Sequence, residues 1–226
     1  KKNFILFTLL CSFFCLSQVA HAQNWTLELH DSFGDGWNGA SINVSINGGP
    51  NTNYTTAGLG TTINLGPIPA GQTITITKVA NGTFVNEVSW ILRAPNNLIK
   101  TWVRDGIYAQ TGVNPIPTFS AFTTTTVNVI AADQVTDGCE FGISLVDSFG
   151  DGWSGGYLTV TVNGNLYYAT IEDGFSGAAA NYDFNVPFGG ASVVIARPFA
   201  GNAFPEEMGW TLTEPAPNAF CTATCV

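Results

Sequence analysis

A nine-residue segment that occurs twice is the feature that most constrains the fold of this chain. Residues 31–39 read Asp-Ser-Phe-Gly-Asp-Gly-Trp-Asn-Gly, and residues 147–155 repeat eight of these nine letters, with Ser154 in place of Asn38. The two segments begin 116 residues apart. A match of this length, with matching flanks, indicates that a whole unit has been duplicated. The chain is therefore predicted to contain two similar units.

Alternating apolar residues on both sides of the repeated segment predict β-strands. The alternation covers residues 25–30 and 42–46 around the first segment, and residues 141–146 and 158–162 around the second. In each unit the second run ends at Asn-Gly, at Asn47 and at Asn163. Period-two alternation closed by Asn-Gly is the strongest local signal for a hairpin. Further strands are predicted over residues 73–79, 123–130 and 192–197.

A third shared element places a glutamate three residues before a tryptophan. Glu87 precedes Trp90, and Glu207 precedes Trp210. After residue 22 no stretch shows helical periodicity, and many of the 25 glycines and 11 prolines of the chain separate short runs rich in Thr, Val and Ile. This pattern is typical of an all-β sandwich. We expect two tandem β-sandwich modules, residues 23–130 and 139–226, joined by a hinge at residues 131–138, each of roughly 85–110 residues and able to bury a modest core.

The first 22 residues have the pattern of a secretory signal peptide. Lys1 and Lys2 are followed by an apolar run over residues 4–16 and by Ala20-His-Ala22, which predicts cleavage before Gln23. An uncleaved membrane anchor is the alternative, but the run is short for a membrane span. Loss of Lys1 and Lys2 takes the formal net charge from −9 to −11. Such a charge argues against nucleic acids and anionic membranes as partners and suits divalent cations, although acidity also keeps a secreted protein soluble.

Three cysteines follow the predicted leader, and all lie in the second unit. In an oxidising compartment we expect Cys139 to form a disulfide with Cys221 or with Cys225. The remaining cysteine would be left to pair with another chain, or with a downstream residue if the sequence is a piece of a longer protein. A zinc site is disfavoured, because Cys221 and Cys225 have no histidine nearby and no second cysteine pair.

The repeated segment has the composition of a metal-binding loop. Asp31 and Asp35 can converge on one point across Gly34, and Ca²⁺ accepts six to eight oxygen ligands in irregular cages. The predicted ligands are Asp31, Asp35, Asn38 and Glu87 in the first unit and Asp147, Asp151, Ser154 and Glu207 in the second. Glu206 competes with Glu207 for this role. The alternative is that the aspartates only cap turns and the glycines only supply positive φ.

Two other functions are open to the same segments. Trp37 and Trp153 could stack on a sugar ring if their indoles are exposed, or they could cover the core. Catalysis finds little support, because His30 is the only histidine after the leader and no nucleophile or phosphate-loop motif is present. Glycosidases do use paired carboxylates, but a duplicated pair on a tight glycine loop favours a metal site. We therefore expect no enzymatic activity.

The repeated loop followed by a Glu-x-x-Trp strand resembles repeats in large secreted surface proteins of Bacteroidetes-type bacteria, many of which leave the cell by the type IX route. The resemblance covers both units. It implies a fold similar to calcium-binding jelly-roll modules of the CUB kind, in which acidic side chains from comparable loops hold Ca²⁺.

These observations together predict a secreted, calcium-stabilised structural or adhesive protein of the cell surface, part of a filament, matrix or adhesin. Its partner would be a surface or matrix component or a second molecule of the same protein. The alternative is a carbohydrate-binding accessory module of a secreted hydrolase that uses Trp37 and Trp153. A third option is self-assembly through an exposed sheet edge or a donated strand, for which residues 123–130 are a candidate.

Overall fold

The computed structural model describes residues 24–103, 126–130, 138–153, 156–171, 177–187, 192–197, 204–215 and 224–225. The predicted signal peptide and residues 131–137 of the predicted hinge lie outside these residues, whereas Gly138, the last residue of the predicted hinge, begins a strand. The described part is all-β, with one short 3₁₀ turn, η1 (Val85–Glu87). The strands are β1 (Trp25–Asp31), β2 (Ala40–Ile46), β3 (Thr52–Tyr54), β4 (Gly60–Gly66), β5 (Thr73–Asn81), β6 (Val88–Arg93), β7 (Ile99–Val103), β8 (Thr126–Ile130), β9 (Gly138–Asp147), β10 (Leu158–Val162), β11 (Asn165–Ala169), β12 (Ala179–Pro187), β13 (Ser192–Ala196), β14 (Met208–Thr213) and β15 (Thr224–Cys225).

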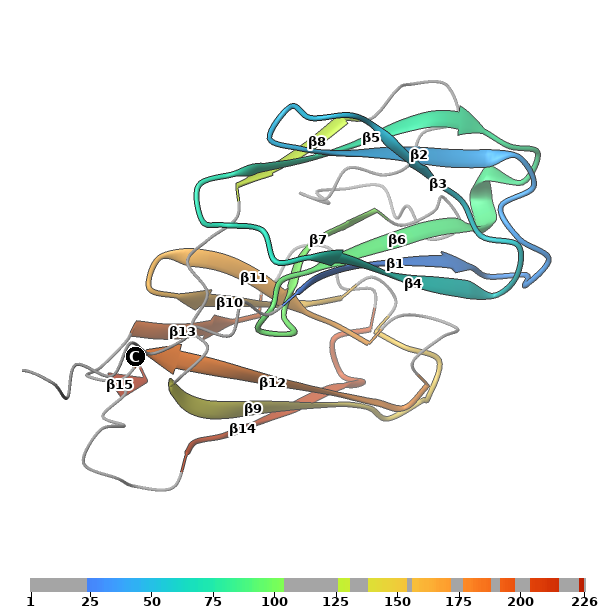
Figure 1. Ribbon diagram of the computed structural model, residues 1–226. Helices are drawn as coiled ribbons and strands as arrows, with labels where there is room; N and C mark the ends of the chain where they lie inside the picture. The colour runs from blue at the N-terminus through green and yellow to red at the C-terminus, as the bar shows by residue number, and fades with distance from the viewer. Residues whose placement is uncertain are drawn as a thin grey trace, which may run out of the picture.

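The strands form three sheets in layers, as Figure 1 shows. A long sheet has the strand order β15-β13-β10-β11-β7-β6-β1-β4, and two smaller sheets have the orders β3-β2-β5-β8 and β12-β9-β14. The four-stranded sheet covers the β4-to-β7 half of the long sheet, and the three-stranded sheet covers the other half from the opposite side. Both packings have the sheet-on-sheet arrangement of a β-sandwich. The predicted all-β class is confirmed.

The duplicated sequence produces duplicated strand pairing. In the first repeat β1 pairs with β4 and β6, and β2 pairs with β3 and β5. In the second repeat β9 pairs with β12 and β14, and β10 pairs with β11 and β13. The long sheet crosses from one repeat to the other where Ile99 of β7 pairs with Tyr168 of β11. The division into two separate modules with a hinge stays a prediction.

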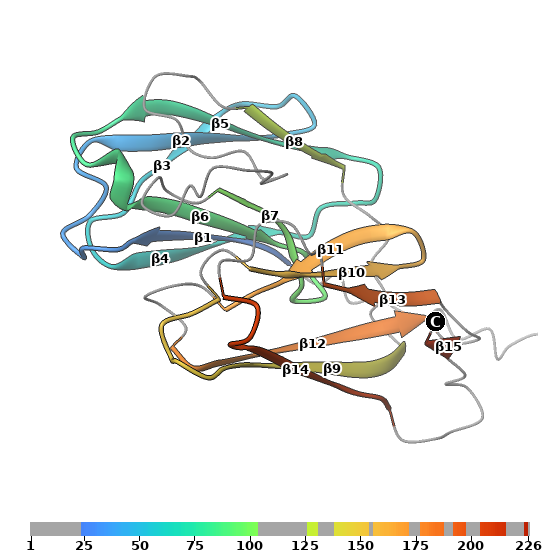
Figure 2. The same cartoon turned by 180° about the vertical axis from the view of Figure 1, so that it is seen from behind.

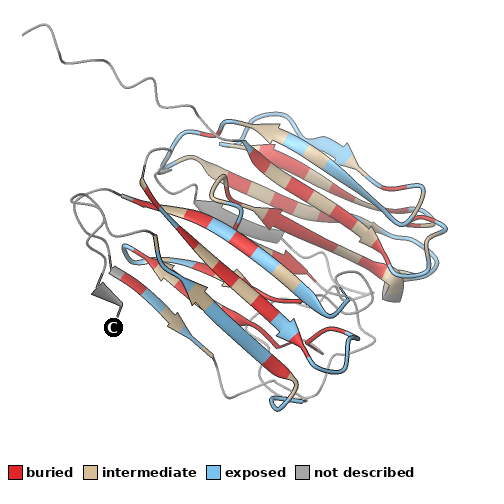
Figure 3. Ribbon diagram, turned by 90° about the horizontal axis from the view of Figure 1, so that it is seen from below, coloured by how far each residue is buried: buried red, intermediate tan, exposed pale blue. Residues whose placement is uncertain are grey.

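Alternation places the core on one face of each strand. β1 is buried at every second residue, with Trp25, Leu27 and Leu29 fully buried. Figure 3 shows the resulting alternation of buried and exposed bands along the strands. Of the strands predicted from short runs, those at residues 73–79 and 192–197 are present as β5 and β13, and residues 126–130 form β8, which pairs with β5. These strands form because their apolar residues recur with the period of the pleat.

The two Asn-Gly turns have the backbone that the sequence predicts. Asn163 and Gly164 have φ values of +48° and +78°, and Val162 pairs with Asn165 in a two-residue hairpin. Asn47 and Gly48 also have positive φ, but pairing of β2 with β3 starts only at Val44 and Thr52. A longer loop therefore follows the same turn in the first repeat.

Candidate metal centres

The first candidate centre is assembled by the pairing of β1 with β6. Asp31 is the last residue of β1 and pairs with Val88, the first residue of β6. Glu87 ends the short turn η1 directly before β6. The backbone N–H of Ser32 donates a hydrogen bond to the carbonyl oxygen of Glu87 at 3.0 Å. Sheet register therefore brings a distant glutamate beside the acidic loop.

Asp31 organises the loop from a fully buried position. Its carboxylate accepts backbone N–H bonds from Phe33 at 3.3 Å, Gly34 at 3.0 Å and Gly36 at 2.6 Å. Hydrogen bonds to an ionised acceptor are stronger than neutral ones and satisfy a carboxylate that water cannot reach. The turn chemistry proposed as an alternative to metal binding is thus present at Asp31, and it leaves the carboxylate on the inner wall of the loop.

The loop can follow this path only because glycine occupies position 36. Gly36 has φ of +93°, and a Cβ built there would lie 2.8 Å from both the Cα of Ala57 and the carbonyl oxygen of Thr56. The segment that contains Thr56 and Ala57 is held against the loop by a hydrogen bond from the backbone N–H of Trp37 to the carbonyl oxygen of Thr56, at 2.9 Å. A side chain at position 36 would collide with backbone, in a conformation that non-glycine residues rarely adopt.

Three carboxylates meet at this loop. Oxygen atoms of Asp31, Asp35 and Glu87 all lie within 4.8 Å of one another. Burial raises the pKa of Glu87, and the nearby carboxylates of Asp31 and Asp35 raise it further. The Oε2 atom of Glu87 is enclosed, and no described residue gives it a hydrogen bond. A cation placed among these oxygens would relieve both the repulsion and the missing partner.

The second repeat builds the same centre from its own residues. The Asp147 carboxylate accepts N–H bonds from Phe149 at 3.3 Å, Gly150 at 2.6 Å and Gly152 at 2.9 Å. Oxygens of Asp147, Asp151 and Glu207 lie within 4.8 Å of one another. Burial raises the pKa of Glu207, followed by the charges of Asp147, Asp151 and Glu206. The structure thus places Glu207 in the cluster, and Glu206 acts on it only through its charge.

Asn38 and Ser154 are the two residues predicted to add side-chain oxygen ligands, and the structure describes only the first of them. The Asn38 amide nitrogen donates to Asp35 Oδ1 at 2.7 Å and to the Gly36 carbonyl oxygen at 2.8 Å. This contact orients Asp35 but presents nitrogen, not oxygen, toward the carboxylate, so the structure gives no support to Asn38 as a ligand. Ser154 lies outside the described residues. The pairing of Cys139 with Cys221 or Cys225 also stays a prediction, because Cys221 lies outside them.

The loop tryptophans belong to the core. Trp37 is 1 % exposed and Trp153 is 2 % exposed. Each indole N–H donates to a backbone carbonyl seven residues earlier, of His30 at 2.8 Å and of Val146 at 3.1 Å. The core interpretation is confirmed, and stacking of these two indoles on a sugar, the other interpretation, is wrong for this structure because no ring face is accessible.

Exposed phenylalanines beside both centres are a feature that sequence reasoning missed. Phe33 and Phe149, two residues after the buried aspartates, are 75 % and 76 % exposed. Phe84 and Phe204, three residues before the clustered glutamates, are both 47 % exposed. The only sequence signal was their identical placement in the two repeats. We name these four residues the phenylalanine rim. Both acidic loops lie toward the same end of the molecule (Figures 1 and 2).

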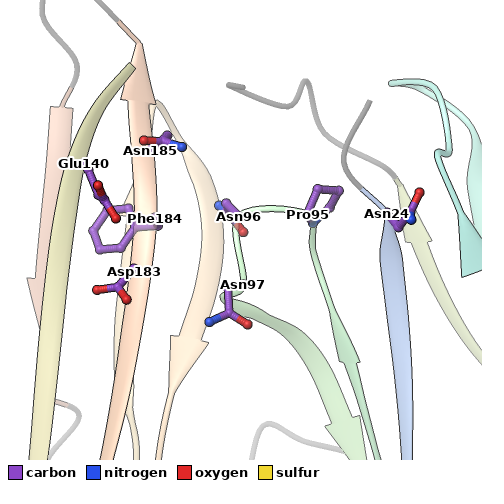
Figure 4. Close-up of a pocket in the computed structure, with 8 residues that line it drawn as sticks. All are labelled: Asn24, Pro95, Asn96, Asn97, Glu140, Asp183, Phe184 and Asn185. Atoms are coloured by element: carbon purple, nitrogen blue, oxygen red, sulfur yellow. The ribbon is translucent and has the colours of Figure 1, made fainter. Parts of the chain in front are cut away.

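A polar cleft lies away from these loops, between the two repeats. Figure 4 shows side chains from the β6–β7 turn facing side chains from β9 and β12 across it. Its volume is about 570 Å³. The lining residues are mostly amides and carboxylates: Asn24, Pro95, Asn96, Asn97, Glu140, Asp183, Phe184 and Asn185. Phe184 is 1 % exposed and presents no ring face to the cleft.

No helix in the described part of the chain is long and apolar enough to cross a membrane. The chain matches no protein-family model, no curated protein and no solved structure.

Proposed function

We propose that this chain is a secreted structural or adhesive protein of the cell surface, non-enzymatic and stabilised by one Ca²⁺ at each acidic loop. The observation that carries the proposal is the occurrence, twice, of three converging carboxylates on a glycine-shaped loop. Three carboxylates supply oxygen ligands of the kind Ca²⁺ accepts, and loop carbonyls and water would complete six to eight positions. Mg²⁺ suits such a site poorly because it requires near-ideal octahedral geometry.

The adhesive part of the proposal is supported by the phenylalanine rim. Large apolar side chains at 75 % and 76 % exposure are costly to leave in water, and their repetition beside both centres favours contact with a partner. Since both loops lie at one end of the molecule (Figure 1), a surface or matrix component could engage them together. Two linked contacts strengthen binding far beyond either one alone.

Thermal unfolding with and without a chelator tests the calcium sites. Extracellular modules bind Ca²⁺ at about 10⁻⁴ to 10⁻³ M, so ~1 mM Ca²⁺ adds roughly 0.4–1.4 kcal/mol per site. Chelation should lower the melting temperature, and Ca²⁺ but not Mg²⁺ should restore it. Asp35→Asn and Asp151→Asn together should abolish the response. Asp183→Asn is the matched control, since Asp183 is exposed and lies outside both clusters. If the control variant also loses the dependence of its melting temperature on Ca²⁺, the proposal of specific Ca²⁺ sites at the two clusters is contradicted.

Adhesion is tested with protein-coated beads on cell-surface or matrix preparations. Phe33→Ala with Phe149→Ala should reduce bead retention, and chelation should reduce it in the unchanged protein. Val194→Ala is the control, because Val194 is also exposed, at 38 %, but lies on β13. If the double variant retains beads as well as the unchanged protein does, the phenylalanine rim has no role in adhesion. Hydrolysis of glycans, peptides or esters, lost on changing one aspartate of a folded protein, would favour an enzyme instead.

Carbohydrate binding is a second candidate, and the polar cleft supports it. Amide and carboxylate side chains such as Asn97, Asp183 and Asn185 are hydrogen-bond partners for sugar hydroxyls. The function would then belong to an accessory module, with the cleft in place of Trp37 and Trp153. Glycan-array binding that is lost in Asn97→Ala but kept after chelation would favour this function over the calcium-dependent one.

A further inference from the structure

β14 occupies the position in the second repeat that β6 occupies in the first. Each strand follows a clustered glutamate and pairs antiparallel with the strand that ends at the buried aspartate. Trp90 of β6 lies opposite Leu29, and Trp210 of β14 lies opposite Leu145. The two strands differ on their other side. β6 also pairs with β7, whereas β14 ends its sheet, with no further strand beside it in the described part of the chain.

Among the described residues, one side of β14 has no strand beside it, and β14 is more exposed than β6. Trp90 is 2 % exposed, and Trp210, at the matching position, is 39 % exposed. Leu92 is fully buried, whereas its counterpart Leu212 is half-buried. Trp210 lies opposite the buried Leu145, as Trp90 lies opposite the buried Leu29, and among the described residues only Trp90 also has a strand on its other side. In the first repeat Val103 of β7 fills the place beside Trp90.

The edge at β14 also lacks the features that usually protect an edge strand. Its sequence, Met-Gly-Trp-Thr-Leu-Thr, contains no charge and no proline. The opposite edge of the same sheet, β12, carries Asp183 and Pro187, and the edge strand β3 has only three residues. Natural proteins block edges with charge, proline or short strands, because an open edge pairs with any extended chain.

The first repeat shows what kind of segment fits there. β7 is an extended run with Ile99, Thr101 and Val103 alternating with Lys100 and Trp102. Acidic residues lie at both ends of β14, at Glu206, Glu207 and Glu214. Two molecules that each carry a net charge of −9 repel, so a basic segment of another protein fits the edge better than a second molecule of this chain.

We infer that β14 is a docking edge for an extended, basic segment of another polypeptide. The segment adds a fourth strand to the three-stranded sheet, antiparallel to β14, in the register that β7 takes on β6. Backbone hydrogen bonds along residues 208–213 hold it, and an aliphatic side chain beside Trp210 takes the place of Val103. This inference does not depend on metal at the acidic loops.

Hydrogen exchange of the whole chain with an added peptide tests the inference. The probe is a synthetic peptide with the sequence of residues 97–103, Asn-Leu-Ile-Lys-Thr-Trp-Val. At saturation it should slow amide exchange of residues 208–213 by at least about tenfold, the slowing expected when exposed amides enter a hydrogen-bonded strand. Exchange in β12 should not change. A scrambled peptide should give no slowing, and a peptide with glutamate in place of the lysine should bind more weakly.

Three outcomes would overturn the inference. The first is that the peptide leaves exchange of residues 208–213 unchanged. The second is that these amides already exchange slowly in the dilute free chain, which would mean that the edge is covered. The third is slowing that rises with protein concentration alone, which would assign the edge to a second molecule. Trp210→Ala should weaken binding of the peptide to the chain. Val194→Ala, a change at another exposed position, should leave peptide binding unchanged.

Discussion

At the scale of single residues, the two aspartates of each loop have different tasks. Asp31 is fully buried and accepts three backbone N–H groups, so it determines the shape of the loop. Asp35 is exposed, and the described contact of its carboxylate is with the Asn38 amide. One aspartate is therefore mainly structural and the other is available for a cation.

This division predicts different effects of substitution. In the presence of a chelator, Asp31→Ala should lower the free energy of unfolding by about 3–5 kcal/mol. Three backbone N–H donors lose a charged acceptor, each such hydrogen bond is worth roughly 1.5–3 kcal/mol, and water replaces only some of them. Asp35→Ala should cost under about 1 kcal/mol in the same buffer. Chemical denaturation with chelator measures both. Equal losses for the two variants would contradict the assignment.

Position 36 gives a second test at this scale. Gly36→Ala places a Cβ against the backbone of Thr56 and Ala57 at φ of +93° and should cost more than about 3 kcal/mol. Gly48→Ala is the matched control, since Gly48 also has positive φ, +71°, but open space around it. It should cost about 1 kcal/mol, from backbone strain alone. The difference between the melting temperatures of the Gly36→Ala and Gly48→Ala variants separates the effect of the steric collision from that of the backbone strain.

At the scale of elements, matched strands in the two repeats differ in what surrounds them. β6 is buried along most of its length between β1 and β7, whereas β14 is buried only at Met208. The contribution of a strand to stability depends on the neighbours that exclude water from it, and in the part of the chain that the structure describes β14 has one neighbouring strand where β6 has two.

The two tryptophans should therefore differ in their contribution to stability. Trp90→Ala should cost about 3–5 kcal/mol, as expected for a fully buried aromatic side chain. Trp210→Ala should cost roughly half of that, since 39 % of the residue is already in contact with water. Urea unfolding of both variants provides the measurement. A larger loss at Trp210 would show that its surroundings are covered in solution.

At the scale of the whole molecule, an aromatic junction joins the repeats. The Trp102 ring meets Tyr168 edge-on at 4.9 Å and Tyr157 at 5.7 Å, measured between ring centroids. Lys100 Nζ donates to the Leu166 carbonyl oxygen at 2.9 Å and lies 4.7 Å from the centroid of the Tyr167 ring. These side-chain contacts join the two repeats in addition to the single backbone pair of Ile99 with Tyr168.

Alkaline pH should weaken this junction. Burial raises the pKa of Tyr157, Tyr167 and Tyr168 above the ordinary value of 10.0. The unfolded chain therefore loses these protons first, and the stability they contribute is complete below pH 10.0 and is lost as pH rises toward the folded values. Unfolding followed by tyrosinate absorbance should show this loss, and Tyr168→Phe should reduce its pH dependence. An identical pH profile for the variant would exclude a role for Tyr168.

The predicted disulfide also belongs to this scale, because it would close the second repeat. Non-reducing mass mapping should find Cys139 linked to Cys221 or to Cys225. A closed loop of about 80 residues stabilises by roughly 4–5 kcal/mol in the chain-entropy model, so reduction should lower the melting temperature. A Cys221–Cys225 link with unlinked Cys139 would contradict the prediction.

The sequence by itself determined the strands and the acidic loops of this protein. Alternation in residues such as Trp25, Leu27 and Leu29 has only one compact solution, a strand with one buried face. Gly34, Gly36 and Gly39, which lie around Asp35, permit the positive φ values of a tight loop. The partnership of Glu87 with these aspartates was also readable, because it recurs in the second repeat.

The tertiary structure decided which side chains the loops expose and how the repeats are joined. Trp37 is buried because its indole N–H reaches His30 and its backbone reaches Thr56, and Phe33 in the same loop is left in water. Both outcomes depend on contacts between distant segments, which a local pattern does not encode. The same holds for β7 and β14. Trp90 and Trp210 have equivalent sequence contexts, but among the described residues Trp90 has a strand on both sides and Trp210 on one, and their exposed fractions are 2 % and 39 %.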